Sequence, residues 1–140
     1  MKLTVLLADV VRAAEGKLDL LGANWNLRQP VPSPFAIAVM LRIPPRDTEV
    51  TEKLVLQLLD SEGHLVQTSE GVHVLNLDID VLVQPSDTAA LLGPDQIWNF
   101  CLNIPTLQLQ GPASYRVRAA IASDPSVTEE VFFQVLPPAV

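Results

Sequence analysis

The chain has 140 residues, of which 49% are apolar and 18% charged, and its net charge is −7. This composition is typical of one folded domain with a single hydrophobic core, and it excludes a disordered or fibrous chain. The negative charge, without any run of Lys or Arg, argues against nucleic acid or a membrane surface as the partner, because both require a concentrated positive face.

The N-terminal segment is apolar but does not have the features of a signal peptide. Asp9 interrupts it, Lys2 is the only charge that precedes it, and no small-residue cleavage site follows. No stretch reaches the roughly 20 apolar residues of a membrane span. Cys101 is the only cysteine, which excludes an internal disulfide and fits a reducing compartment. We therefore expect the segment to remain in the mature protein as a strand.

Twelve prolines divide the chain into segments, most of which alternate between apolar and polar residues. Because proline lacks the N–H that a sheet ladder needs, prolines predict loops and the segments between them predict strands. Gly16 and Gly63 predict two hairpin turns, and residues 86–93 predict one short helix. The predicted strands cover residues 3–11, 17–28, 35–43, 53–60, 64–68, 71–84, 96–104, 114–122 and 128–136.

In the predicted strand 17–28, the apolar residues shift from even to odd positions at Gly22. Leu18 and Leu20 occupy even positions, whereas Trp25 and Leu27 occupy odd ones. A β-bulge at Gly22 would keep all four on the core face, because one extra residue restores the parity and glycine accepts the left-handed conformation. We favour this bulge over a strand that ends at Gly22 with Trp25 in a loop, and we expect Trp25 to be largely buried.

These strands are too many for one flat sheet. The sequence therefore predicts an all-β fold, in which residues 1–140 form a single antiparallel β-sandwich of about seven to nine strands. The sandwich is expected to be immunoglobulin-like or jelly-roll-like. Trp98 is expected to have a structural role in it, on the apolar side of the strand that contains Cys101.

Two pairs of charged residues suggest a row of salt bridges on the solvent-exposed face of the sheet. Asp78 and Asp80 alternate with apolar residues in one strand, and Arg116 and Arg118 do so in another. Paired carboxylates also occur in glycosidases and calcium sites. Calcium ligands generally come from loops, however, and these two aspartates fall in mid-strand. We therefore favour cross-strand ion pairs over catalysis or metal binding.

Other candidate chemistry is sparse. His64 and His73 lack partners at zinc-ligand spacing, and Cys101 has no basic neighbour in sequence that would activate its thiol. The sequence contains no nucleophile elbow, no metalloprotease motif and no phosphate-binding loop. We therefore expect a protein that is not an enzyme and needs no cofactor or metal.

Two predicted strands carry apolar side chains on both faces. Residues 35–41 place Met40 on the outer side, and residues 130–136 place Phe132 there. A strand that is buried on one face only has no need of such residues. We expect at least one of these outer faces to be a protein interface, with Phe132 the stronger candidate because it is large and rigid.

Four short motifs give the chain a resemblance to a known family. They are Leu7-Ala8-Asp9, Gly16-Lys17-Leu18, the segment from Gly22 to Trp25 and the turn from Asp60 to Gly63. Over nearly its whole length the chain resembles a family of small uncharacterised proteins of actinobacteria and their bacteriophages. This resemblance implies a β-sandwich from a bacterium or a phage, located in the bacterial cytoplasm or in a virion. It carries over no catalytic residue.

These observations favour a non-enzymatic, protein-binding β-sandwich. Its expected partners are other protein subunits, as in a homo-oligomer or a phage particle in which it is a structural or decoration protein. The alternative is a small-ligand module that binds a carbohydrate or calcium through loops 30–34, 44–52 and 85–95. Its candidate ligands are the carboxylates of Asp47, Glu49, Asp87 and Asp95.

Overall fold

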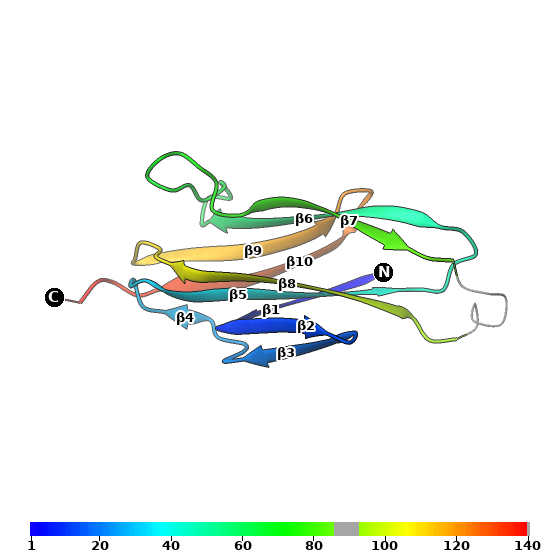
Figure 1. Ribbon diagram of the computed structural model, residues 1–140. Coiled ribbons are helices and arrows are strands. Elements are labelled where there is room, and N and C mark those ends of the chain that lie inside the picture. Colours follow the sequence, from blue (N-terminus) through cyan, green and yellow to red (C-terminus); the bar gives the residue numbers. More distant parts are fainter. Residues whose placement is uncertain (86–92, 140) are drawn as a thin grey trace.

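The computed structural model describes residues 1–85 and 93–139, and these form strands joined by turns and loops (Figure 1). No helix occurs within these two ranges. The helix predicted over 86–93 lies, apart from Gly93, outside the described residues. The strands are β1 (Lys2–Ala8), β2 (Val10–Ala14), β3 (Lys17–Leu21), β4 (Leu27–Arg28), β5 (Ser33–Ile43), β6 (Val50–Asp60), β7 (Asn76–Val83), β8 (Gln96–Leu107), β9 (Ala113–Ile121) and β10 (Asp124–Val135).

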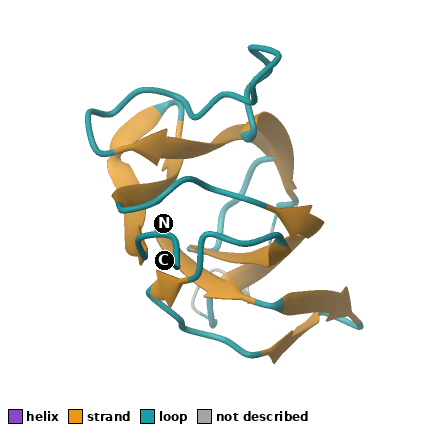
Figure 2. Ribbon diagram, turned by 90° about the vertical axis from the view of Figure 1, so that its left-hand side faces the viewer, coloured by secondary structure: helices purple, strands orange, loops and turns teal. Residues whose placement is uncertain are grey.

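The strands form two facing layers, with a separate hairpin beside one of them (Figures 1 and 2). One layer is a three-stranded sheet in the order β1-β5-β8, and the other is a five-stranded sheet in the order β4-β10-β9-β6-β7. All neighbouring strands are antiparallel except β4 and β10, which are parallel. The all-β prediction is confirmed, and the described part of the chain holds ten strands rather than seven to nine.

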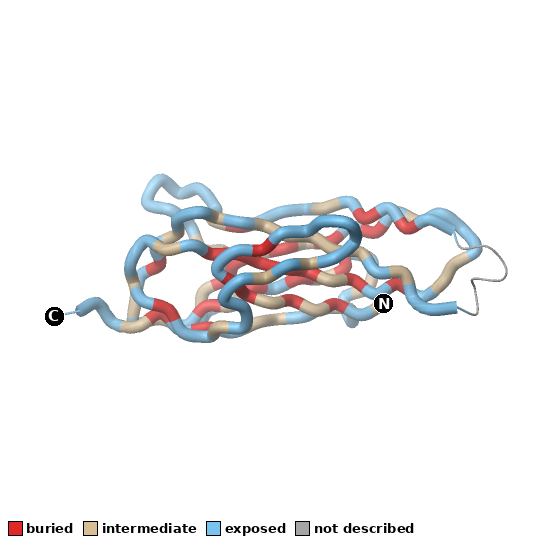
Figure 3. Tube along the Cα trace, turned by 60° about the horizontal axis from the view of Figure 1, so that its bottom comes forward, coloured by how far each residue is buried: buried red, intermediate tan, exposed pale blue. Residues whose placement is uncertain are grey.

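The core lies between the two layers and follows the alternation seen in the sequence (Figure 3). In β5 the odd-numbered side chains from Phe35 to Ile43 are buried, and in β9 the same holds from Tyr115 to Ile121. Alternate residues of a strand point to opposite faces of the sheet, so each strand contributes every second side chain to the core. The alternation of apolar and polar residues therefore predicts which side chains of these strands lie in the core.

The hairpin of β2 and β3 covers the outer face of the three-stranded sheet. Its two-residue turn has positive φ at both Glu15 (52°) and Gly16 (71°), the combination that suits the twist of a tight hairpin. Val11 packs with Ala36 and Ala38 of β5 in a small second core. Alanine at these two positions leaves room for the hairpin to lie close to the sheet.

Asparagine side chains of β8 hold this hairpin in place. The amide of Asn103 accepts a hydrogen bond from the Val11 N–H (2.9 Å) and donates one to the Val11 carbonyl (2.7 Å). This side chain therefore pairs with the β2 backbone much as a neighbouring strand would. Asn99 adds a bond from its Nδ2 to the carbonyl of Gly16 (3.0 Å), at the turn.

The predicted bulge at Gly22 is wrong. The β2–β3 ladder is regular up to the pair Val10–Leu21, and Gly22 follows the last residue of β3 with φ of 64°. The change of parity arises because the strand ends there and the chain crosses to β4 in the other sheet. Leu27, which was expected on the core face, is exposed.

Trp25 lies in this crossing loop, yet its side chain reaches the core. Its ring meets Phe35 and Phe133 edge to face, with centroid distances of 5.5 and 5.3 Å. Most of the surface of Trp25 is covered, as predicted, and a smaller part remains in contact with solvent. The expectation that Trp25 faces the core is thus confirmed, although it does so from a loop.

Arg28 closes the same end of the core and is only 8% exposed. Its Nη2 donates to Ser33 Oγ (2.7 Å) and to the Leu107 carbonyl (2.6 Å), and its guanidinium lies over the rings of Trp25 and Phe35. Burial lowers the pKa of Arg28, and the carboxylate of Asp9 opposes that shift. The side chain thereby ties β4 to β5 and β8.

The segment between β6 and β7 is more irregular than the sequence indicated. Residues 64–68 do not form a strand, and β7 begins only at Asn76. The predicted turn at Gly63 is present, with φ of 83°. Asp60 stabilises it, because its Oδ1 accepts hydrogen bonds from the N–H groups of Glu62 and His64, each at 2.9 Å.

Candidate protein-interaction site

Phe132 lies on the outer face of β10, where the five-stranded sheet meets solvent. Val131, Phe133 and Val135 point towards the core, so Phe132 points away from it, and its side chain is 60% exposed. Leu27 of β4 is 51% exposed and is paired with Gln134, two residues along the same face. The two apolar side chains are therefore diagonal neighbours on an open surface.

A shallow groove of about 340 Å³ lies beside these two residues. β4 forms only two pairs with β10, so the sheet ends abruptly here and leaves a recess next to the final strand. The groove is lined by Asn26, Leu27, Ser114, Phe132, Phe133 and Gln134. The arrangement is an aromatic anchor with small and amide side chains around it, which is typical of the centre of a protein interface.

Arg116 borders this surface on β9. It is the register partner of Phe132, and its Nη1 lies 3.6 Å from Glu130 Oε2. Both members of the ion pair are half-buried, so the guanidinium is held in place beside the ring. We call the group formed by Leu27, Ser114, Arg116, Phe132 and Gln134 the Phe132 surface.

Met40, the other predicted contact residue, is placed differently. Its strand, β5, has neighbours on both sides, and the β2–β3 hairpin covers the preceding outward-facing residues Ala36 and Ala38. Met40 itself is half-buried and is paired with Asn99, which binds the hairpin turn. The apolar outer side of residues 35–41 is therefore covered for the most part by the chain itself. A role for Met40 in binding another protein stays a prediction.

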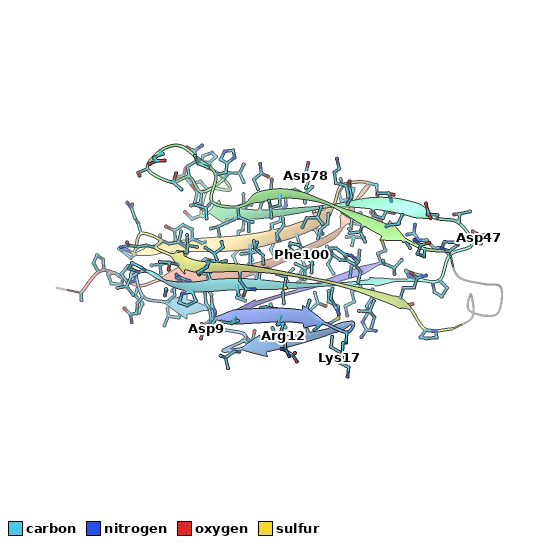
Figure 4. The ribbon with its side chains drawn as sticks, in the orientation of Figure 1. Asp9, Arg12, Lys17, Asp47, Asp78 and Phe100 are labelled. Atoms are coloured by element: carbon cyan, nitrogen blue, oxygen red, sulfur yellow. The ribbon has the colours of Figure 1, made fainter. Side chains whose placement is uncertain are left out.

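The predicted row of salt bridges is wrong in its pairing. Asp78 and Asp80 are exposed on β7, and Figure 4 shows Asp78 pointing away from the core. β6 lies between β7 and β9, so neither aspartate is a cross-strand neighbour of Arg116 or Arg118. Asp80 is paired instead with Lys53 of β6. Local charge patterns could not reveal this strand order.

The predicted acidic loop residues do not converge on one site. Asp47 is exposed in the β5–β6 loop (Figure 4). Glu49 is exposed in the same loop, and Asp95 is exposed before β8. Asp87 lies outside the described residues. Within residues 1–85 and 93–139, no three His, Cys, Asp or Glu side chains come together in a group that could hold a metal ion.

Several polar residues with a structural role were missed in the sequence. Glu52 is buried at the edge of the core, where its carboxylate accepts a hydrogen bond from Ser123 Oγ (2.6 Å) and lies 3.4 Å from Arg46 Nη1. The one available signal was parity, since Glu52 occupies the same face of β6 as Leu54. Asn103 gave a similar signal, because it alternates with apolar residues on an uncharged strand.

Trp98 was expected to be structural, and it packs against the main core from β8. Its ring is stacked on that of Phe100 at a centroid distance of 6.0 Å and an interplanar angle of 5°. Both rings are half-buried.

The chain belongs to DUF6941, a family of unknown function, whose model matches residues 3–134. No curated protein and no solved structure matches the chain. Where the structure describes the chain, it contains no helix with the length and apolar character needed to cross a membrane.

Proposed function

We propose that this protein is a non-enzymatic, protein-binding domain and that its principal contact is the Phe132 surface. The observation that carries this proposal is the exposure of Phe132 beside Leu27 on a regular strand. Exposing two large apolar side chains together is unfavourable in water, whereas burying them against a partner is favourable. Arg116 and the amides at the rim supply the polar contacts that usually surround such an anchor.

We further infer that the two layers form a β-sandwich of the immunoglobulin-like type rather than a jelly roll. Three features support this. The chain crosses from β1 in one sheet to β4 in the other, and β4 then runs parallel to β10. The Tyr115 hydroxyl, near the start of β9, donates a hydrogen bond to the Gln110 carbonyl (2.8 Å). Such a bond back to an upstream carbonyl is a recurrent feature of immunoglobulin-like sandwiches.

We propose that the domain acts as a subunit of a larger assembly, such as a phage particle, in the bacterial cytoplasm or in the virion. The resemblance to proteins of actinobacteria and their phages motivates the phage setting. A net charge of −7 favours partners with a basic contact surface. Glu130, which has the same strand parity as Phe132 on β10, would contribute to such recognition.

The test compares Phe132→Ser with Leu82→Ser. Leu82 is a matched control, because it is 52% exposed on the outer face of β7, away from the Phe132 surface. Tagged wild-type and variant proteins would be purified from the native host, and each copurifying protein would be quantified by mass spectrometry. We expect a partner of the wild type to be retained by Leu82→Ser and reduced at least about tenfold by Phe132→Ser, the loss that corresponds to one interface anchor. Equal recovery with both variants would refute this use of Phe132.

A further inference from the structure

The outer edge of β8 differs from other sheet edges in the molecule. Among the described residues, β8 is the last strand of the three-stranded sheet and is paired with β5 on one side only. It extends over 12 residues and contains no charged side chain. Long exposed edges usually carry charges or proline that prevent pairing with another strand. Here Pro105 is the only such feature, near the C-terminal end of the strand.

One edge of the other sheet, at β7, carries charged side chains of the kind that prevent pairing with another strand. β7 ends the five-stranded sheet, and it carries the exposed carboxylates of Asp78 and Asp80. A second acidic chain that approached this edge would meet like charge. β8 itself carries no charged side chain, so a second copy of this chain, whose net charge is −7, would meet no like charge on this strand.

An apolar row runs along the inner side of β8. Its four side chains pack against the core but remain only half-buried, and Phe100 lies between the two layers (Figure 4). Near the C-terminal half of the row, a groove of about 380 Å³ separates β8 from the segment 72–77. The row consists of Trp98, Phe100, Leu102 and Ile104.

The sequence of β8 is complementary to itself when two copies run antiparallel about Cys101. In that register Trp98 is opposite Ile104, Phe100 is opposite Leu102, and Asn99 is opposite Asn103. The inward-facing pairs nearest the axis are then apolar, and Gln96 opposite Thr106 is a polar pair at the ends of the strand. Aromatic–aliphatic pairs of this kind stabilise antiparallel strands. The β2–β3 hairpin occupies the other face of β8 through Asn99 and Asn103, so the backbone edge and the apolar row are what a partner can reach.

We propose that two copies of this chain form a symmetric dimer by antiparallel pairing of their β8 strands about a twofold axis at Cys101. The two three-stranded sheets then become one continuous six-stranded sheet. The half-buried rings of Trp98 and Phe100 gain cover from the second copy. The Phe132 surface lies on the other sheet and stays accessible, so the dimer does not depend on the function proposed above.

The first experiment measures the molar mass of the full chain by sedimentation equilibrium across micromolar concentrations. We expect a dimer, and we expect Leu102→Glu to weaken it by about a hundredfold or more, because each dimer would place two carboxylates against Phe100 without a partner. Leu82→Glu, at the exposed control site on β7, should leave the dimer unchanged, as should Phe132→Ser. A monomeric wild type, or an equally tight Leu102→Glu dimer, overturns the proposal.

A second measurement covers the case in which Leu102→Glu does not fold. In the proposed register the two Cys101 residues are directly opposite, and opposed residues of antiparallel strands have Cα atoms about 4.5–5.5 Å apart. This spacing is within the range that a disulfide can bridge. Mild oxidation of the wild type should therefore yield a covalent dimer that reducing agent reverses and that Cys101→Ser abolishes. Absence of this product under conditions that oxidise the thiol overturns the proposed register and the dimer with it.

Discussion

The outer faces of β5 and β10 both carry apolar side chains, but the described part of the chain covers only the first. On β5 the outward residues Ala36 and Ala38 are buried beneath the β2–β3 hairpin. On β10 the outward residue Phe132 is exposed, and no strand or loop of the described chain covers it. The two faces also differ in size of side chain, since small residues admit a closely packed hairpin and a phenylalanine does not. The comparison shows that small outward-facing residues allow the chain to cover its own sheet, whereas the larger Phe132 remains exposed.

The largest loss of stability is expected when a charged side chain is placed on the covered face of β5. Ala36→Glu would bury a carboxylate without a partner beneath the hairpin, and we expect it to lower the free energy of unfolding by about 3–5 kcal/mol. Ser114→Glu places the same group on the open face, where it should change stability by less than about 0.5 kcal/mol. Urea denaturation of both variants measures the difference. Similar losses of unfolding free energy in the two variants would show that the outer faces of β5 and β10 do not differ in burial.

A smaller loss is expected when the attachment of the hairpin is removed. Asn103→Ala deletes both hydrogen bonds to the Val11 backbone, so we expect about 1–2 kcal/mol of destabilisation. Amide exchange should accelerate most in β2 and β3. Asn99→Ala, which deletes a single bond to the Gly16 carbonyl, is the matched control and should have the weaker effect. Exchange that is unchanged in β2 would mean that packing alone holds the hairpin.

Tyr115 tests the core beneath the open face. Tyr115→Phe deletes the hydrogen bond to the Gln110 carbonyl and should cost about 0.5–1.5 kcal/mol near neutral pH. Burial, with a further contribution from Asp60, raises the pKa of Tyr115 above its ordinary value of 10.0.

The sign of the pH effect follows from that shift. A raised pKa stabilises the folded state at every pH below the unfolded value, and this contribution is lost as the pH rises through the folded value. Above about pH 10 the free energy of unfolding should therefore fall more steeply for the wild type than for Tyr115→Phe. The difference in unfolding free energy between the two proteins should then become smaller. Denaturation midpoints at pH 8 to 11, roughly spanning the unfolded pKa, measure this. Parallel curves for the two proteins would contradict it.

The smallest effect on stability is expected on the open face itself. Phe132→Ser removes a side chain that is already 60% exposed, so it should change the free energy of unfolding by less than about 0.5 kcal/mol. Thermal denaturation of the purified chain checks this. A loss of several kcal/mol would place Phe132 in the core and would remove the basis for a binding role.

The core of the strands could be predicted from the sequence, because alternation is a local property of the chain. The odd-numbered side chains of β5 and β9 are buried as expected. The change of parity at Gly22 was ambiguous, since a bulge and a strand that ends produce the same pattern. Trp25 does not follow this alternation, because its large ring reaches the core from a loop that has no regular period.

Strand order and buried polar groups could not be predicted. The aspartates of β7 and the arginines of β9 have matching spacing, but β6 separates them, and only the pairing of distant strands decides this. Arg28 is buried because four carbonyl and hydroxyl oxygens accept hydrogen bonds from its guanidinium. The oxygens of Ser33 and Pro34 are close in sequence, whereas the Leu107 carbonyl of β8 is far away in sequence. Of the proposed interaction site, Phe132 was identified from its parity, whereas Leu27 was wrongly assigned to the core.

The parallel pairing of β4 and β10 has a mechanical consequence. The start of β1 and the end of β10 lie towards opposite ends of the molecule (Figure 1), and the chain passes from β1 through the hairpin to β4. The ladder is continued by the Gln134 N–H to Asn26 carbonyl bond (2.9 Å) and the Leu136 N–H to Arg28 carbonyl bond (3.0 Å). These hydrogen bonds run across the strands. A force along the strands would therefore act on both bonds at the same time, so that they would have to break together and not one after the other. Arg28 attaches β4 to β5 and β8, so pulling β4 along the sheet would also have to break the hydrogen bonds of this side chain.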